Sequence, residues 1–205
     1  MADLKKKLSH KGWWLCHFAL ALCACTEVPE LGSAEMSGNT LIDRDGQRYH
    51  TILIGNQRWM AQNLNYQTDN DPCYDYKLSN CETYGRLYSW KAAVTACPNG
   101  WHLPSDTEWG TLVNFVGGAS TAGIKLKSTS GWKNSGNGTN EHGFSALPGG
   151  SDFDNAGGSG YWWSASEDNV SSAWSRSMHS GSDNVNRESS GKAHLLSVRC
   201  VMDVN

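Results

Sequence analysis

The sequence contains no hydrophobic run long enough to cross a bilayer. Its N-terminal apolar stretch covers residues 13–24, about 12 positions interrupted only by His17, whereas a membrane-spanning helix needs roughly 20. Four lysines precede this stretch, and a short apolar run behind a basic segment is typical of a signal peptide. A buried N-terminal helix is the alternative. We therefore predict a signal peptide over residues 1–24.

The sequence also lacks an excess of positive charge and the common catalytic signatures. Without residues 1–24, which carry four Lys and one Asp, 13 basic and 19 acidic side chains remain. A nucleic-acid partner requires a basic surface, so we expect none. Gly-x-Ser-x-Gly, P-loop, dinucleotide-binding and His-Glu-x-x-His patterns are absent. We therefore expect no catalysis, the alternative being an enzyme that acts on an extracellular polymer.

Cysteine is present in an odd number, and one cysteine lies in a distinctive setting. The stretch from Leu22 to Cys25 resembles the bacterial lipobox, in which Leu and small residues precede a cysteine that is diacylated. Cleavage before Cys23 would place Leu22 where a small residue is needed, so Cys25 is the expected lipidation site. If Cys16 and Cys23 leave with the signal peptide, four cysteines remain to form disulfides. They are Cys73, Cys81, Cys97 and Cys200.

Four cysteines can pair in three ways. We expect Cys73–Cys81, because these two bracket one polar loop, and Cys97–Cys200, because this pair joins a helix end to the last strand. The second bridge would close a loop of about 100 residues and contribute on the order of 4–5 kcal/mol in the chain-entropy model.

These features predict an exported lipoprotein of the bacterial envelope, anchored at the outer membrane or cell surface. Residues 25–39 are rich in Glu, Ser, Gly and Pro and predict a flexible tether. Residues 40–205 then form one folded domain. Its partners would be the membrane, through the lipid, and an extracellular glycan or protein. A purely structural envelope lipoprotein is a further alternative.

The hydrophobic pattern of the domain predicts an α+β fold. Strands are expected at 40–43 and 49–54, on either side of an Asp-Gly turn, and at 58–61. Helices are expected at 89–96, with Trp90 and Val94 on one face, and after Ser105, where Ser105 and Glu108 form a capping-box pattern. From Ser120 onward we expect long Gly-, Ser- and Asn-rich loops between short strands. These strands are expected at 144–147, 161–164, 173–175 and 195–201.

Seven short stretches, in order, resemble the Fibrobacter succinogenes major paralogous domain. They are 43–49 (DRDGQRY), 54–64 (IGNQRWMAQNL), 84–90 (YGRLYSW), 97–104 (CPNGWHLP), 144–150 (FSALPGG), 160–164 (GYWWS) and 197–201 (SVRCV). The resemblance implies a secreted or surface protein with no established activity. It also implies a C-type lectin-like fold, related to formylglycine-generating enzymes. Those enzymes use a close pair of reactive cysteines, whereas Cys97 and Cys200 lie in contexts typical of a structural disulfide.

The segment 164–192 has the composition expected of a ligand-binding surface. It is almost wholly polar, with Trp174 as an aromatic anchor, and Ser, Gly and Asn side chains give adaptable hydrogen bonding. A solvated loop region is the alternative. The predicted ligand contacts are Trp174, Ser175, Arg176, Ser177, His179, Asn184, Asn186, Arg187 and Glu188.

No cofactor is expected, with calcium as the one candidate to consider. Calcium takes six to eight oxygen ligands, and Asp152 and Asp154 form an acidic stretch in a Gly-rich segment. Asp and Asn are also common in turns, and the pattern does not match an EF-hand loop.

Overall fold

The computed structural model describes residues 36–203. The predicted signal peptide, the lipidation site Cys25 and most of the predicted tether lie outside them. Within the described residues the chain forms four α-helices and two five-stranded sheets, which confirms the expected α+β class. None of the helices in this part of the chain has the length and hydrophobicity that a bilayer crossing requires.

The first sheet joins the start of the domain to its end. Its order is β1-β2-β3-β4-β10, and every neighbouring pair is antiparallel. The expected opening hairpin is confirmed, with a turn at Asp45 and Gly46 between β2 and β3. Strand β10 pairs with β4 and places Val201 opposite Trp59. The strands are β1 (Met36–Ser37), β2 (Thr40–Ile42), β3 (Arg48–Ile54), β4 (Gln57–Met60) and β10 (Val201–Asp203).

The second sheet contains most of the segment that the sequence predicts to be loop-like. Its order is β5-β9-β6-β7-β8, with β6, β7 and β8 antiparallel and β9 parallel to β6. The Ser- and Asn-rich residues 172–191 are therefore a regular β-hairpin, not solvated loops. The strands are β5 (Leu87–Tyr88), β6 (Ser159–Glu167), β7 (Ser172–His179), β8 (Asn186–Gly191) and β9 (Leu196–Ser197).

Two of the four helices were expected. In the second of these, α3, Ser105 and Glu108 form the predicted capping box, and Trp109 and Leu112 are buried. In α2 the small residues Ala93 and Ala96 are buried, whereas Val94 is 39% exposed. The helices are α1 (Leu78–Tyr84), α2 (Trp90–Ala96), α3 (Asp106–Phe115) and α4 (Ala119–Leu126), with a 3-10 turn, η1 (Tyr74–Tyr76), before α1.

The unexpected helix α4 depends on Gly123. A Cβ atom at this position would lie 2.4 Å from the main-chain oxygen of Asn184, in the turn between β7 and β8. The main chain of Ile124 donates to the oxygen of Asp183, 3.2 Å away, in the same turn. Glycine destabilises a helix by about 1 kcal/mol relative to alanine, so the sequence pattern does not predict this helix. Because Gly123 has no side chain, the helix can pack against the turn.

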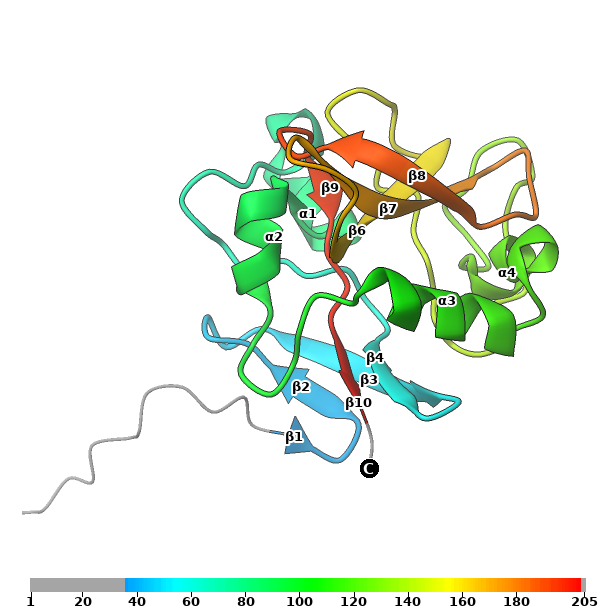
Figure 1. The fold of residues 1–205 in the computed structure, drawn as a ribbon, viewed down its shortest axis with the longest axis horizontal. Helices are drawn as coiled ribbons and strands as arrows, with labels where there is room; N and C mark the ends of the chain where they lie inside the picture. Colours follow the sequence, from blue (N-terminus) through cyan, green and yellow to red (C-terminus); the bar gives the residue numbers. More distant parts are fainter. Residues whose placement is uncertain (1–35, 204–205) are drawn as a thin grey trace, which may run out of the picture. The chain divides into compact units, whose positions relative to one another are not determined.

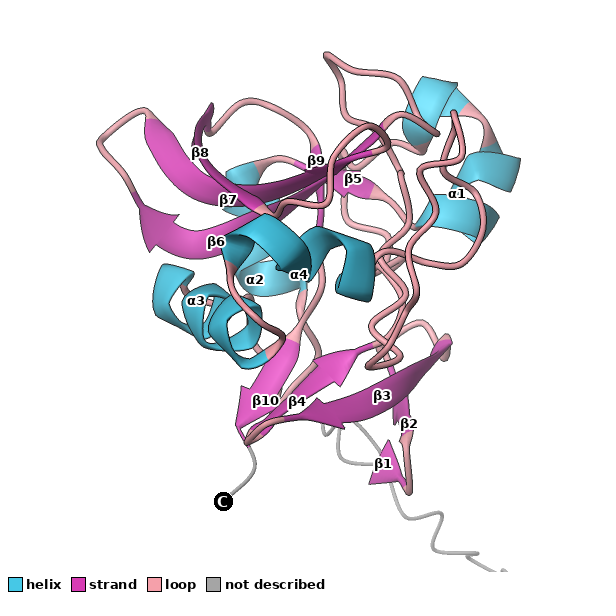
Figure 2. Cartoon of the chain, turned by 90° about the vertical axis from the view of Figure 1, so that its right-hand side faces the viewer, coloured by secondary structure: helices cyan, strands magenta, loops and turns pink. Residues whose placement is uncertain are grey.

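Helices α2 and α3 lie between the two sheets (Figures 1 and 2). Trp109 of α3 contacts Trp59 of β4, with ring centres 4.9 Å apart, and its indole N–H donates to the oxygen of Trp163 in β6. One helix thus connects the cores of both sheets. Adjacent Trp162 and Trp163 are both fully buried, on opposite faces of β6.

A buried arginine connects residues that are far apart in the sequence. Arg199 is fully buried, and its guanidinium donates to Asn63 Oδ1 and to the main-chain oxygens of Phe144 and Ser145. Asn63 Oδ1 also accepts from the indole of Trp162, 2.9 Å away. Burial lowers the pKa of Arg199 to about 9, so the group is charged at neutral pH. Because a buried charge is costly unless it is hydrogen-bonded, this network fixes the relative positions of four segments.

Both expected disulfides are present. Cys73–Cys81 joins the residue before η1 to α1, with Cα atoms 4.9 Å apart. Cys97–Cys200 joins the end of α2 to the residue before β10, with Cα atoms 5.9 Å apart.

Candidate binding site

The predicted ligand contacts are divided between the two faces of the β7–β8 hairpin. Side chains alternate along a strand, so Trp174 and Arg176 point to one face of β7 while Ser175, Ser177 and His179 point to the other. Ser175 and Ser177 are fully buried, and Arg176 is only 4% exposed. These three side chains are not available for the direct ligand contact that the composition predicts.

The first face of the hairpin is an ion-pair cluster at the start of α3. The Asp106 carboxylate lies 2.8 Å from Arg176 Nη2 and 2.9 Å from Arg187 Nε. The guanidinium carbon of Arg187 lies 3.3 Å from the centre of the Trp174 ring, and so covers it. Desolvation by itself would raise the pKa of Asp106. Hydrogen bonds from Arg187 and Arg176 outweigh it and lower this pKa below its usual value. The expected aromatic anchor and both guanidiniums are therefore engaged within the protein.

The second face of the hairpin carries a continuous chain of polar groups. Ser177 Oγ donates to the Glu188 carboxylate, accepts from Asn186 and lies 3.1 Å from His179 Nε2. The hydrogen bond with the His179 ring lowers the pKa of Glu188, and the hydrogen bond with Ser177 lowers it further. Partial burial would by itself raise this pKa. His179 Nδ1 in turn lies 3.0 Å from Ser159 Oγ on β6. His179, Asn186 and Glu188 are partly exposed, and ligand contact at these positions stays a prediction.

Asn184 is exposed, but it lies in the turn between β7 and β8 rather than on the face that carries His179 and Glu188. The predicted contacts therefore do not form one surface. Their sequence pattern is explained instead by a strand pair whose buried hydroxyl groups bond to one another, such as Ser175 with Ser190 at 2.8 Å.

A cleft that the sequence did not predict lies beside this polar chain. Its first part is a hollow of about 380 Å³ between the segment 72–76, next to the Cys73–Cys81 disulfide, and the segment 151–155. Its second part is an adjoining hollow of about 360 Å³ along residues 67–72. Both hollows are lined by Pro72, Tyr76 and Leu195, which places these residues at the boundary. Together they are called the cleft below.

Exposed aromatic rings line the first hollow. Tyr76 is 86% exposed and Phe153 is 50% exposed, and Tyr74 also belongs to the lining. Phe153 is held by edge contacts to Tyr161 and His194, with ring centres 5.1 and 4.8 Å away. Exposed aromatic rings that gather in one hollow can mark a ligand-binding groove. The only sequence signal is for Tyr74 and Tyr76, which lie between two bridged cysteines, and Phe153 has none.

Carboxylates from five aspartates also line the cleft. Two of them contact basic side chains, because Asp75 pairs with Lys77 and Asp152 lies 3.2 Å from His194 Nδ1. Asp154 accepts a hydrogen bond from Tyr161, 2.9 Å away, which connects the cleft to the polar chain of the hairpin. The remaining two are Asp69 and Asp71.

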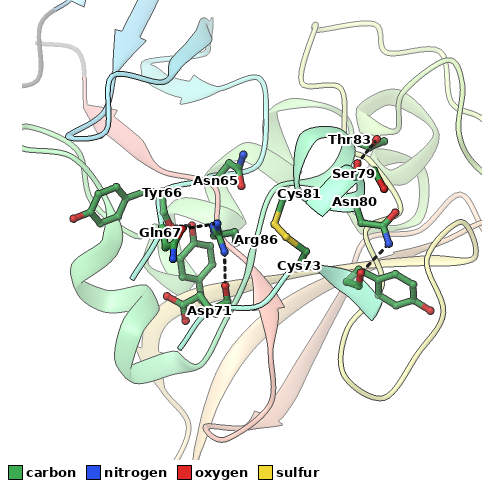
Figure 3. The surroundings of a disulfide bond; sticks show 12 residues. Asn65, Tyr66, Gln67, Asp71, Cys73, Ser79, Asn80, Cys81, Thr83 and Arg86 are labelled. Atoms are coloured by element: carbon green, nitrogen blue, oxygen red, sulfur yellow. Dashed lines mark hydrogen bonds between the residues drawn. A yellow bond between two sulfur atoms is a disulfide. The ribbon is translucent and has the colours of Figure 1, made fainter. Parts of the chain in front are cut away.

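Asp71 is the unusual member of this group. The residue is only 5% exposed, and its Oδ2 has no hydrogen-bond partner among residues 36–203. The nearby Arg86 guanidinium donates to the main-chain oxygen of Asp71, 2.8 Å away, and to Gln67, not to the carboxylate (Figure 3). Desolvation raises the pKa of Asp71 to about 6, although Arg86 opposes the shift. A buried carboxylate without a partner is costly, and in a cleft it is a candidate contact for a ligand.

The candidate calcium ligands are occupied by contacts within the protein. Asp152 accepts from the main chain of Leu195, 2.9 Å away, and pairs with His194, while Asp154 accepts from Tyr161. Among residues 36–203 no three His, Cys, Asp or Glu side chains converge as metal ligands would.

The described part of the chain is thus a disulfide-braced α+β domain with an acidic cleft that exposes aromatic rings. The family model described as the Fibrobacter succinogenes major domain matches residues 52–202, and the chain belongs to this family. No curated protein and no solved structure matches the chain.

Proposed function

We propose that this protein is a glycan-binding module of the bacterial envelope. In this proposal the protein is exported and held at the outer membrane or cell surface by a lipid on Cys25. Its domain is C-type lectin-like and binds an extracellular ligand without cofactor or catalysis. The observation that carries the proposal is the cleft, where Tyr74, Tyr76 and Phe153 lie beside carboxylates on two loops.

The chemistry of the cleft suits a sugar. A pyranose ring has an apolar face that stacks on aromatic rings, and its hydroxyl groups donate to carboxylates and amides. Tyr76 and Phe153 supply exposed rings, and Asp75, Asp152 and Asn155 supply acceptors within the same hollow. Binding sites commonly combine such an apolar lining with a few convergent polar groups.

The burial of the polar chain on the hairpin favours binding rather than catalysis. The chain Ser159–His179–Ser177–Glu188 contains the side chains that a nucleophilic enzyme uses. However, Ser159 is 5% exposed and Ser177 is fully buried, so neither hydroxyl is accessible to a polymer. Cys97 and Cys200 form a disulfide and are not available as thiols.

The test is binding of soluble glycan oligomers to the full chain, purified in a mild detergent and followed by intrinsic tryptophan fluorescence. We expect saturable binding that falls by about tenfold or more in Tyr76→Ala and Phe153→Ala, since a lost anchor contact typically costs more than about 1 kcal/mol. Val170→Ala is the matched control, because Val170 is 92% exposed and lies outside the cleft lining.

A second comparison separates the cleft from the hairpin. The triple variant Asn186→Ala, Arg187→Ala, Glu188→Ala removes partly exposed side chains of β8 and should retain binding. Loss of binding in this variant, with normal binding by the two cleft variants, would place the site on the hairpin. Release of shortened glycan would instead identify an enzyme.

A further inference from the structure

The cleft combines an excess of negative charge with a buried carboxylate, that of Asp71, whose Oδ2 accepts no hydrogen bond from the described residues. Five aspartates line its two hollows, and none of the described lining residues is Lys, Arg or His. Lys77 and His194 lie nearby, but they pair with Asp75 and Asp152. In the second hollow, neither the Asp69 nor the Asp71 carboxylate is hydrogen-bonded to a cationic side chain of the described residues.

We propose that the ligand carries a protonated primary amine that pairs with the Asp71 carboxylate, while the Tyr76 ring contacts the adjoining apolar part. This inference rests on the proposed function and names the class of sugar that the cleft takes, an amino sugar with a free amine. Three features of the second hollow carry it.

The first feature is the partner-free oxygen. Asp71 Oδ2 is buried and accepts no hydrogen bond from the described residues, and the whole residue is only 5% exposed. A buried charge of this kind is stabilised by a cation that brings its own hydrogen-bond donors. Arg86 is in reach of the Asp71 main chain, yet both its Nη atoms are committed to Asp71 O and Gln67 Oε1.

The second feature is the aromatic boundary. Tyr76 lines both hollows and is 86% exposed, so its ring is available to a ligand that spans them. An ammonium group near an aromatic face also gains a cation–π attraction of about 0.5–1 kcal/mol at an exposed site.

The third feature distinguishes an amine from a metal ion. A calcium ion needs six to eight oxygen ligands, and no group of three His, Cys, Asp or Glu side chains converges within residues 36–203. An ammonium group needs only one carboxylate and one or two further acceptors. Asp71 and the exposed Asp69 of the same hollow meet that need.

Three tetrasaccharides test the inference. A glucosamine tetramer carries free amines, the N-acetylglucosamine tetramer has the same rings without the charge, and cellotetraose has hydroxyl groups in their place. The full chain should bind the glucosamine tetramer at least about tenfold more tightly than the other two near neutral pH, as expected for one charge-assisted contact.

The variant Asp71→Asn should abolish this preference while retaining the weaker binding of the neutral tetramers. Asp183→Asn is the control, since it removes the same charge from an exposed position outside the cleft. If all three tetramers bind equally, or if Asp71→Asn keeps the preference, the inference is overturned and the proposed function stands. If none binds, both are overturned.

Discussion

Replacing Asp71 by Asn tests whether the partner-free carboxylate lowers the stability of the folded chain. The carboxyl titrates near its ordinary value of 3.8 when the chain is unfolded, and burial raises its pKa to about 6 in the folded state. Between these two values the folded chain holds the proton more tightly than the unfolded chain. The contribution of Asp71 to stability is therefore most favourable below about pH 3.8, falls as the pH rises, and is least favourable above about pH 6.

The size of the effect follows from the shift. A rise from 3.8 to about 6 corresponds to about 3 kcal/mol, because a tenfold change in proton affinity is about 1.4 kcal/mol. Asp71 lines an open hollow, so solvent screening reduces this cost, and we expect about 1–2 kcal/mol. Asp71→Asn keeps the shape and removes the charge. It should therefore stabilise the protein above about pH 6 and have little effect near about pH 4.

The assay is thermal unfolding of the full chain, followed by tryptophan fluorescence over the pH range 4–8. A gain of about 1–2 kcal/mol raises the midpoint by roughly 2–8 °C for a domain of this size. Asp69→Asn is the control, since Asp69 lines the same hollow but is exposed, and its change should stay within about 0.5 kcal/mol. A variant that is less stable than the wild type above about pH 6 would refute the reasoning. A residue that lowers the stability of the folded chain in this way fits a binding role.

Three further predictions concern other parts of the chain. Labelling with a fatty-acid analogue should mark the wild type but not Cys25→Ser, and equal labelling of both would exclude Cys25 as the lipidation site. The double variant Cys97→Ser, Cys200→Ser should lose about 2–5 kcal/mol in denaturant unfolding, and an unchanged midpoint would contradict a structural role for this bridge. Asp106→Ala should destabilise the protein by about 1–3 kcal/mol, because it leaves the buried Arg176 without its partner. Since the pKa of Asp106 is lowered, the difference should shrink as the pH falls through that pKa, which the same unfolding assay checks.

Sequence patterns predicted those elements whose stabilising contacts lie close together in the sequence. The helix after Ser105 has a capping box and an apolar stripe within ten residues, and the opening hairpin has its turn in the sequence. Cys73 and Cys81 bracket one short loop, and this closeness in the sequence predicts their pairing. Helix α4 could not be predicted in this way, because Gly123 is explained only by the main chain of residues 183–184, which packs against it.

The β7–β8 hairpin shows why composition alone misleads. Ser175, Ser177 and Ser190 are typical of loops, yet in the fold they are buried and hydrogen-bonded across two strands. The cleft was missed for a different reason. It combines residues 67–76 with residues 151–155 and Leu195, and no spacing in the sequence relates these segments.

The bridge between Cys97 and Cys200 also determines how the domain responds to a single cut in its chain. It closes a covalent ring over a sequence separation of 103, and this ring contains α3, α4 and strands β6 to β9. An extracellular protease that cuts once anywhere between the two cysteines opens the ring but releases no fragment. Strand β10 would stay paired with β4, and both ends of the cut chain would remain attached to the N-terminal part. The domain would therefore remain one covalent molecule after a single cut in an exposed loop of this region.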